Sequence, residues 1–172
     1  MPPNEFDVQK LNHIAWRCRD AEETRLFYEG VLGLPLAHVV RGDRVPSTGE
    51  ERKFVHLFFR MKDGSFVAFF DLGDNKVAVP DPATPGWVTH LSLEVGSREE
   101  LEQARRRLIA AGVQVNGIVD HHWLHSIYFL DPNGIHLELA WRAEGQDVMD
   151  GFERSAHDEL ALWTSEKRRL AA

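Results

Sequence analysis

The chain has 172 residues, of which 43% are hydrophobic and one is cysteine, and its net charge at neutral pH is −7. This length corresponds to one domain, or to two small modules that share a core, and it excludes a multidomain assembly. The acidic balance leaves no surplus of positive charge to neutralise phosphates, so we expect no nucleic-acid partner.

The cysteine content and the absence of apolar runs bear on location. Cys18 has no possible disulfide partner within the chain, which agrees with a reducing compartment. The first ten residues, MPPNEFDVQK, lack the basic and apolar regions of a signal peptide. No stretch approaches the roughly 18 uninterrupted apolar residues of a membrane span. We therefore expect a cytoplasmic protein with no membrane partner.

Residues 10–72 predict a strand, a helix and three further strands. LNHIAWRC (11–18) alternates like a half-buried strand, and the helix that follows begins at Asp20 and ends at Gly33. LPLAHVV, KFVHLFFRM and GSFVAFFDL then predict three strands. Residues 41–52, between two of these strands, are expected to form a long loop, and such loops often close over a site.

Residues 87–142 repeat this order. WVTHLSLEV predicts a strand, a helix follows from Ser97 to Gly112, and VQVNGIVD, SIYFL and IHLELAW predict three more strands. Residues 72–86 contain three prolines and two glycines and have the composition of a linker. His13 and His90 occupy equivalent positions in the two halves. The chain therefore contains two copies of one module.

The predicted fold class is α+β, with two βαβββ modules in residues 1–142 and a C-terminal helical extension in residues 143–172. Ala156, Leu160 and Trp163 of the extension have helical spacing and give one apolar face. We expect this face to pack on the domain or on a partner subunit.

A metal site is predicted from the strand faces. Glu138 shares a strand face with His136, and if the modules pair about a pseudo-twofold axis, Glu138 can converge on both His13 and His90. Two imidazoles and one carboxylate form the facial triad that suits Fe(II), with Mn, Zn or Ni as alternatives. A lone histidine on a strand is more often structural, but the repeat favours a shared metal-binding role.

Two segments, LNHIAWRCRDAEETRLFYEGVLGLPL and DHHWLHSIYFLDPNGIHLEL, resemble the vicinal oxygen chelate superfamily. This superfamily includes glyoxalase I, extradiol dioxygenases, fosfomycin-resistance thiol transferases and bleomycin-resistance proteins. The resemblance covers residues 10–142. It implies a cup-shaped mixed sheet around a divalent metal that binds substrate through two neighbouring oxygens. The ligands that it implies here are His13, His90 and Glu138.

The resemblance also bears on the reaction. The fourth ligand position of glyoxalase I falls on Ala68, which can neither ligate a metal nor move a proton. Extradiol dioxygenases use three ligands, and the resemblance assigns Tyr128 and His121 to positions beside the substrate oxygens. Tyr128 has the alternative role of a wall residue, and His121 that of a loop residue.

The histidine that larger extradiol enzymes use as acid and base has no counterpart, since Gly64 and Ser65 stand in its place. By strand parity, His56 or His136 can replace it, and each is alternatively a wall residue. Three phenylalanines on the same cup face would give an aromatic pocket, namely Phe58, Phe66 and Phe70. Their alternative role is plain core packing.

These features predict an extradiol-type dioxygenase that cleaves a catechol-like ring and forms a homodimer, with a small aromatic molecule as substrate. The alternatives are a thiol transferase or glyoxalase-like isomerase of the same superfamily, and a binding protein that sequesters its ligand without chemistry. A phosphonate substrate would require converging cations. The strand faces offer Arg17 and Arg60, both towards strand ends.

Overall fold

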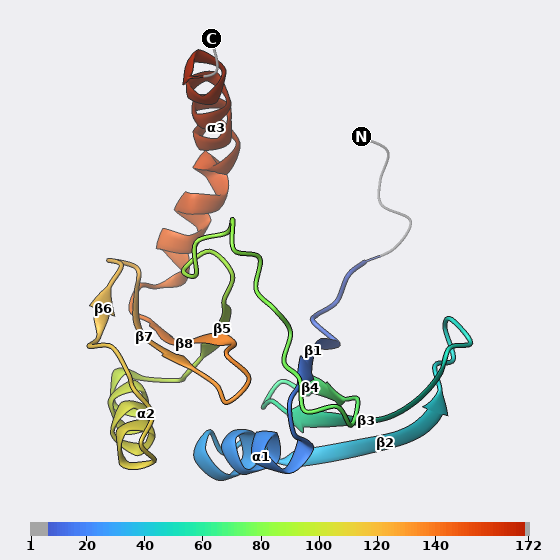
Figure 1. Cartoon of the computed structure of the whole chain (residues 1–172). Helices are drawn as coiled ribbons and strands as arrows, with labels where there is room; N and C mark the ends of the chain where they lie inside the picture. The colour runs from blue at the N-terminus through green and yellow to red at the C-terminus, as the bar shows by residue number, and fades with distance from the viewer. Residues whose placement is uncertain (1–6, 171–172) are drawn as a thin grey trace.

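The computed structural model describes residues 7–170, which form two four-stranded mixed sheets and associated helices (Figure 1). The expectations for residues 1–6 and 171–172 lie outside the described part. The first sheet has the strand order β1-β4-β3-β2 and the second β5-β8-β7-β6. The elements are β1 (His13–Cys18), α1 (Ala21–Arg25), η1 (Leu26–Val31, a π-helical turn), β2 (Leu36–Arg44), β3 (Glu51–Arg60), β4 (Phe66–Asp71), β5 (Leu91–Glu94), α2 (Arg98–Ala110), β6 (Val119–Asp120), β7 (Leu124–Leu130), β8 (His136–Arg142) and α3 (Gln146–Leu170).

The predicted α+β class and the βαβββ order of each half are confirmed. β1 and β5 run parallel to their neighbours β4 and β8, and the remaining pairs are antiparallel. The predicted helix starts are correct as well. The side chain of Asp20 accepts a hydrogen bond from the backbone of Glu23, and that of Ser97 accepts one from Glu100. Each therefore satisfies an amide that the first helical turn leaves free.

Three segments differ from expectation. Residues 41–52 are mostly hairpin, because β2 continues to Arg44 and β3 begins at Glu51 (Figure 1). At Gly42 a Cβ would lie 2.6 Å from the Phe54 ring, so the absence of a side chain lets the two strands stay paired. In the second module, the strand expected over 113–120 is reduced to Val119–Asp120, since Asn116 and Gly117 have low β propensity. The module's first strand begins at Leu91, one residue after His90.

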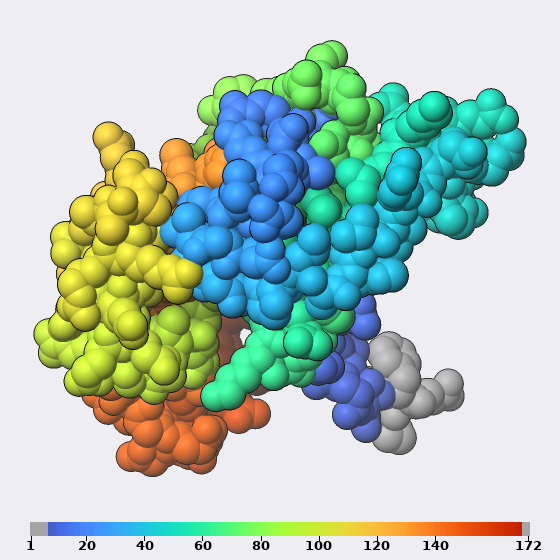
Figure 2. Space-filling model, turned by 90° about the horizontal axis from the view of Figure 1, so that it is seen from below, coloured from blue at the N-terminus to red at the C-terminus, as the bar shows by residue number. Residues whose placement is uncertain are grey.

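One hydrophobic core joins the two modules. Tyr28 is fully buried, stacks on Phe59 and donates a hydrogen bond of 3.1 Å to Asp131 in the β7–β8 turn. The guanidinium of Arg107 on α2 donates to the carbonyl of Gly30 in η1. Figure 2 shows the same arrangement from below, with the helical segment of the first module packed beside α2. The helices and the apolar sheet faces thus fix the modules against each other.

The long helix α3 projects away from the two sheets (Figure 1). Its residue Phe152 contacts the ring of Trp123, while Leu160 and Trp163 are exposed. Within residues 7–170, none of the helices is both long enough and apolar enough to cross a membrane.

Candidate metal centre

The first module places His13 among aromatic side chains. β1, β4 and β3 lie side by side, with His13 opposite Phe66 and His56 opposite Phe70. The His13 ring lies 5.6 Å from the Phe58 ring and 6.1 Å from His56. The predicted aromatic face therefore exists, and it contains two imidazoles.

His56 is the most buried polar group of this face. Its ring stacks on Phe70 with centroids 3.6 Å apart, and the residue is 9% exposed. Within the described part of the chain, its Nε2 atom has no hydrogen-bond partner. Burial, and after it the neighbouring His13 and His38, lowers the pKa of His56 to about 4. The imidazole is therefore neutral at physiological pH.

The second module brings His90 and Glu138 together. Glu138 lies on β8 opposite Ser92 on β5 and Tyr128 on β7, and it is 5% exposed. The Nε2 atom of His90 is 3.3 Å from Oε2 of Glu138. The hydroxyl of Tyr128 donates a 2.8 Å hydrogen bond to Oε1 of the same carboxylate. One carboxylate oxygen is thus held by a donor, and the other faces an imidazole nitrogen.

The carboxylate of Glu138 is ionised at neutral pH despite its burial. Burial acts to raise its pKa, but the hydroxyl groups of Ser126, Tyr128 and Ser92 and the His90 imidazole act in the opposite direction and prevail. The pKa therefore lies below its usual value. A buried anion of this kind is the partner that a cation requires.

Both proposed histidine ligands have Nδ1 engaged with an oxygen. Nδ1 of His13 is 2.7 Å from the side-chain oxygen of Asn12, and Nδ1 of His90 is 3.2 Å from the carbonyl of Trp87. Because these oxygens accept hydrogen bonds, a proton on Nδ1 satisfies each contact and leaves Nε2 as the nitrogen that can bind a cation. Metal-binding histidines are oriented in this way. The donor set present therefore fits a divalent cation.

His121 extends the contacts of Tyr128. Its Nε2 atom lies 2.9 Å from the Tyr128 hydroxyl. Since that hydroxyl gives its proton to Glu138, His121 is the donor in this contact. Burial and the Glu138 carboxylate raise the pKa of Tyr128, so the phenol keeps its proton. The neighbouring His125 stacks on Trp141 and does not reach this group.

The predicted site residues thus form two groups. His90, Glu138, Tyr128 and His121 are together on the second module, and His13 and His56 are together on the first. Within residues 7–170, no three His, Cys, Asp or Glu side chains are arranged to hold a metal ion. One chain therefore does not assemble the three predicted ligands at one point.

Sequence reasoning missed the groups that orient the two histidines. Asn12 directly precedes His13, and this adjacency was the available signal. The Trp87 carbonyl has no sequence signal, because it belongs to the backbone. The contact between Tyr28 and Asp131 was missed as well, although both lie in the segments that carry the resemblance.

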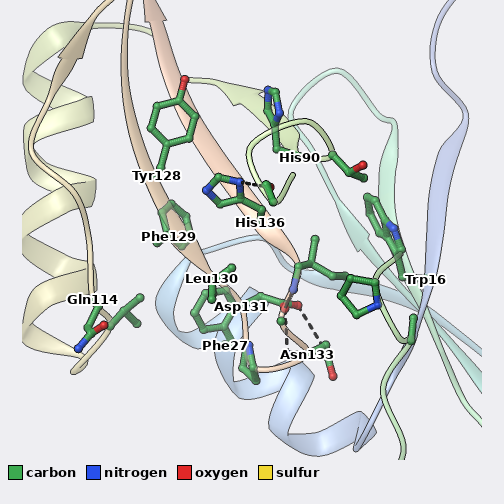
Figure 3. A pocket seen from close by; sticks show the side chains of 18 of the residues that line it. Trp16, Phe27, His90, Gln114, Tyr128, Phe129, Leu130, Asp131, Asn133 and His136 are labelled. Carbon is green, nitrogen blue, oxygen red and sulfur yellow. Dashed lines mark hydrogen bonds between the residues drawn. The ribbon is translucent and has the colours of Figure 1, made fainter. Parts of the chain in front are cut away.

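A cleft of about 900 Å³ adjoins the second group of residues (Figure 3). His90, His136 and Tyr128 line one part of it, and Trp16 lies across from them. The linker forms another wall and is tied to the site, since Nδ1 of His136 is 3.2 Å from the carbonyl of Gly86. The cleft is large enough for a small organic molecule.

Residues 10–139 match the glyoxalase/bleomycin resistance protein/dioxygenase superfamily. The chain belongs to this superfamily. It is 25% identical over 162 residues to a 2,2',3-trihydroxybiphenyl dioxygenase of Sphingomonas paucimobilis, with 91% of this chain and 49% of that protein aligned. The chain spans about half the length of the curated relatives it matches.

Solved structures share the fold. The glyoxylase/bleomycin resistance protein/dioxygenase domain from Frankia sp. EAN1pec matches with a TM-score of 0.66 and 21% identity, over 81% of this chain and 96% of that one. The fosfomycin resistance protein FosX from Listeria monocytogenes, in complex with Mn(II) and sulfate, matches with a TM-score of 0.56 and 18% identity, over 78% and 93%. Divalent metal binding therefore occurs within the superfamily.

Proposed function

We propose that this protein is a metal-dependent extradiol dioxygenase that opens a catechol-like ring with dioxygen. The observation that carries the proposal is the buried Glu138 carboxylate, held on one oxygen by Tyr128 and facing the Nε2 atom of His90 on the other. The absence of a fourth donor at Ala68 supports a three-ligand centre of His13, His90 and Glu138. The alignment with a trihydroxybiphenyl dioxygenase supports the same reaction class.

Fe(II) is the preferred metal for two histidines and one carboxylate, with Mn, Zn and Ni as alternatives. Bound there, Fe(II) would supply positions for two neighbouring substrate oxygens and for dioxygen, and would transfer electrons between them. Both oxygen atoms of dioxygen enter the product as the carbon–carbon bond beside a hydroxyl breaks. The reaction thus needs no external reductant, and it can take place in the cytoplasm, where we place the protein.

Within this proposal, Tyr128 and His121 act on the carboxylate and on the substrate side of the site. Tyr128 fixes the orientation of Glu138 and leaves Oε2 free to bind. His121 holds the Tyr128 hydroxyl from the opposite side and is exposed. It is therefore placed to take up or release the proton of an incoming hydroxyl group.

The aromatic face of the first module supplies the wall for the ring. Phe58 and Phe70 pack around His56, whose neutral imidazole has a nitrogen without a partner. An apolar aromatic wall of this kind suits a flat aromatic molecule. His56 is accordingly the residue we propose as the acid and base, in preference to His136, which contacts the linker.

The second candidate is a thiol transfer to an epoxide, as an enzyme of the fosfomycin-resistance type would perform. The fold likeness to FosX favours it. The charge of Arg17 does not favour this reaction, because its guanidinium is ion-paired with Asp74 and also donates to the carbonyl of Lys76. A phosphonate would have to compete for this guanidinium.

The test is metal analysis of anaerobically purified protein, followed by catechol and 2,3-dihydroxybiphenyl with air admitted. We expect iron and a yellow ring-fission product that absorbs in the visible range. The matched variant is Glu138→Gln, which keeps the size of the side chain and removes its charge. Zinc, nickel or manganese with no colour would move the protein to the transferase or isomerase branch, and a metal-free protein that still binds catechols would be the sequestering type.

A further inference from the structure

We propose that α3 pairs antiparallel with α3 of a second copy of this chain, with Leu160 at the centre of the contact. The proposal concerns the helix that projects from the two sheets, and it is independent of the reaction proposed for the metal centre (Figure 1). The two helices form an isologous contact, in which each copy offers the same surface to the other.

The first observation is that most of α3 is not covered by its own chain. The helix runs over Gln146–Leu170, which corresponds to a length of about 37 Å. Near its beginning Phe152 contacts the ring of Trp123, but every residue from 152 to 169 is exposed. Helices in proteins owe most of their stability to the packing of an apolar face. The projecting part of α3 is therefore expected to have a partner outside its own chain.

The second observation is an apolar stripe along this projecting part. Spacings of four, four and three residues place its members on one face of the helix, and they are Phe152, Ala156, Leu160 and Trp163. Leu160 is 61% exposed and Trp163 is 55% exposed. Alternating spacings of three and four residues are typical of the line along which two helices pack. The narrow stripe thus fits a single partner helix.

The distribution of charge along α3 favours a second copy as the partner and fixes its direction. Acidic residues dominate the part nearer the sheets, and they are Asp147, Asp150, Glu153, Asp158 and Glu159. Basic residues end the helix, and they are Lys167, Arg168 and Arg169. Among the residues that the structure describes, none of these side chains is in an ion pair. In an antiparallel pair the acidic part of each copy lies beside the basic end of the other, and the two helix dipoles oppose each other. A parallel pair would bring like charges together.

The spacing of the stripe sets the register of the pair. When Leu160 of one copy faces Leu160 of the other, Ala156 lies opposite Trp163, so the smallest side chain of the stripe makes room for the largest. Glu153 and Lys167 lie seven residues before and after Leu160, and the same register brings them together. Because α3 projects away from the sheets, the sheets of the two copies lie at opposite ends of the contact (Figure 1).

Matched substitutions on two faces of α3 test the proposal. Leu160→Asp places two like charges at the centre of the contact, so we expect its mass by sedimentation at micromolar concentration to be half that of the wild-type protein. Leu162→Asp is the control, because Leu162 is 59% exposed but lies about 200° around the helix from Leu160, outside the stripe. It should keep the wild-type mass.

Two outcomes of this comparison would overturn the proposal. One is an equal mass for Leu160→Asp and the wild-type protein, which would mean that the stripe holds no second copy. The other is the same loss of mass in both variants, which would mean that the stripe is not the surface of contact. Circular dichroism establishes whether each variant is folded.

Cysteine cross-linking tests the direction of the pair. The native Cys18 is buried, so the introduced thiols are the ones that react under mild oxidation. Chains with Glu153→Cys and chains with Lys167→Cys should form a disulfide-linked pair when mixed. Neither should do so alone, because antiparallel pairing about Leu160 places identical positions about 21 Å apart, too far for a disulfide.

The cross-links also separate the other possible partners. A link between two Glu153→Cys chains would indicate parallel helices and overturn the proposed arrangement. If the mixture forms no link, α3 serves a different protein, and the proposal fails whatever reaction the metal centre performs.

Discussion

At the residue scale, the orientation of the Glu138 carboxylate depends on the Tyr128 hydroxyl that donates a hydrogen bond to it. Tyr128→Phe removes the donor to Oε1 and leaves the ring in place. Loss of an outer contact to a ligand weakens metal binding by about 10- to 100-fold, so we expect a reduction of this order in Mn(II) affinity by titration calorimetry. His125→Gln is the control, because His125 packs on Trp141 and should leave the affinity unchanged. Equal affinity in both variants would remove Tyr128 from the site.

The low pKa of His56 has a consequence for stability. The folded pKa of about 4 lies below the value of 6.5 for a free imidazole, so below 6.5 the unfolded chain binds a proton that the folded chain does not. Stability of the metal-free protein should therefore fall as pH decreases from 6.5 to 4, by at most about 1.4 kcal/mol per pH unit from this group.

Urea unfolding at several pH values, in the presence of a chelator, measures this effect. In His56→Gln the dependence between pH 4 and 6.5 should become flatter, while His38→Gln should keep most of it, because His38 is only a neighbour that lowers the pKa. An unchanged slope in His56→Gln would mean that the imidazole takes up a proton in the folded state as readily as in water.

The contact between His90 and Glu138 in the second module was predictable from the sequence. The position of His13, apart from both of them, was not. Glu138 lies on β8 and His90 directly precedes the neighbouring strand β5, so the strand order brings the two side chains together. The place of His13 depends on how the modules pack. That packing is set by the burial of Tyr28 and Phe27 against the β7–β8 turn and the end of β7. The hydrophobic periodicity of a single element does not predict such a contact between modules.

At the element scale, the predicted helix starts can be tested through their caps. In Ser97→Ala the first turn of α2 loses the acceptor for the amide of Glu100. Such a change costs about 1 kcal/mol of unfolding free energy. Chemical denaturation should show this loss with an unchanged slope against denaturant. The control Ser155→Ala lies within α3, where the hydroxyl bonds the carbonyl of Phe152 and makes no cap. Equal stability of the two variants would contradict the capping role.

Other elements were predicted less well, because pairing overrides local composition. The hairpin of β2 and β3 extends through residues that look like a loop, and Gly42 is accommodated by the ring of Phe54 across the ladder. Conversely, Val113 and Val115 have strand propensity, but within the described residues Val115 makes only an isolated bridge to Phe129. Strand propensity is therefore realised where a partner strand lies alongside.

At the scale of the whole molecule, the two modules are joined by a buried polar contact within an apolar core. Tyr28→Phe removes the hydroxyl that donates to Asp131 and keeps the ring that stacks on Phe59. Leaving a buried acceptor without its donor costs about 1–3 kcal/mol, so we expect unfolding in urea at lower concentration.

The pH dependence of this difference identifies its cause. Burial raises the pKa of Asp131 above its usual value, and the hydrogen bond from Tyr28 is among the contacts that act against this rise. A raised folded pKa means that the unfolded chain releases this proton first, so the contribution of Asp131 to stability declines as pH rises through the window between the two values. Because the Tyr28 hydroxyl favours the charged carboxylate, its removal costs more once Asp131 is ionised. The stability difference between wild type and Tyr28→Phe should therefore widen with increasing pH, and a constant difference would assign the loss to packing alone.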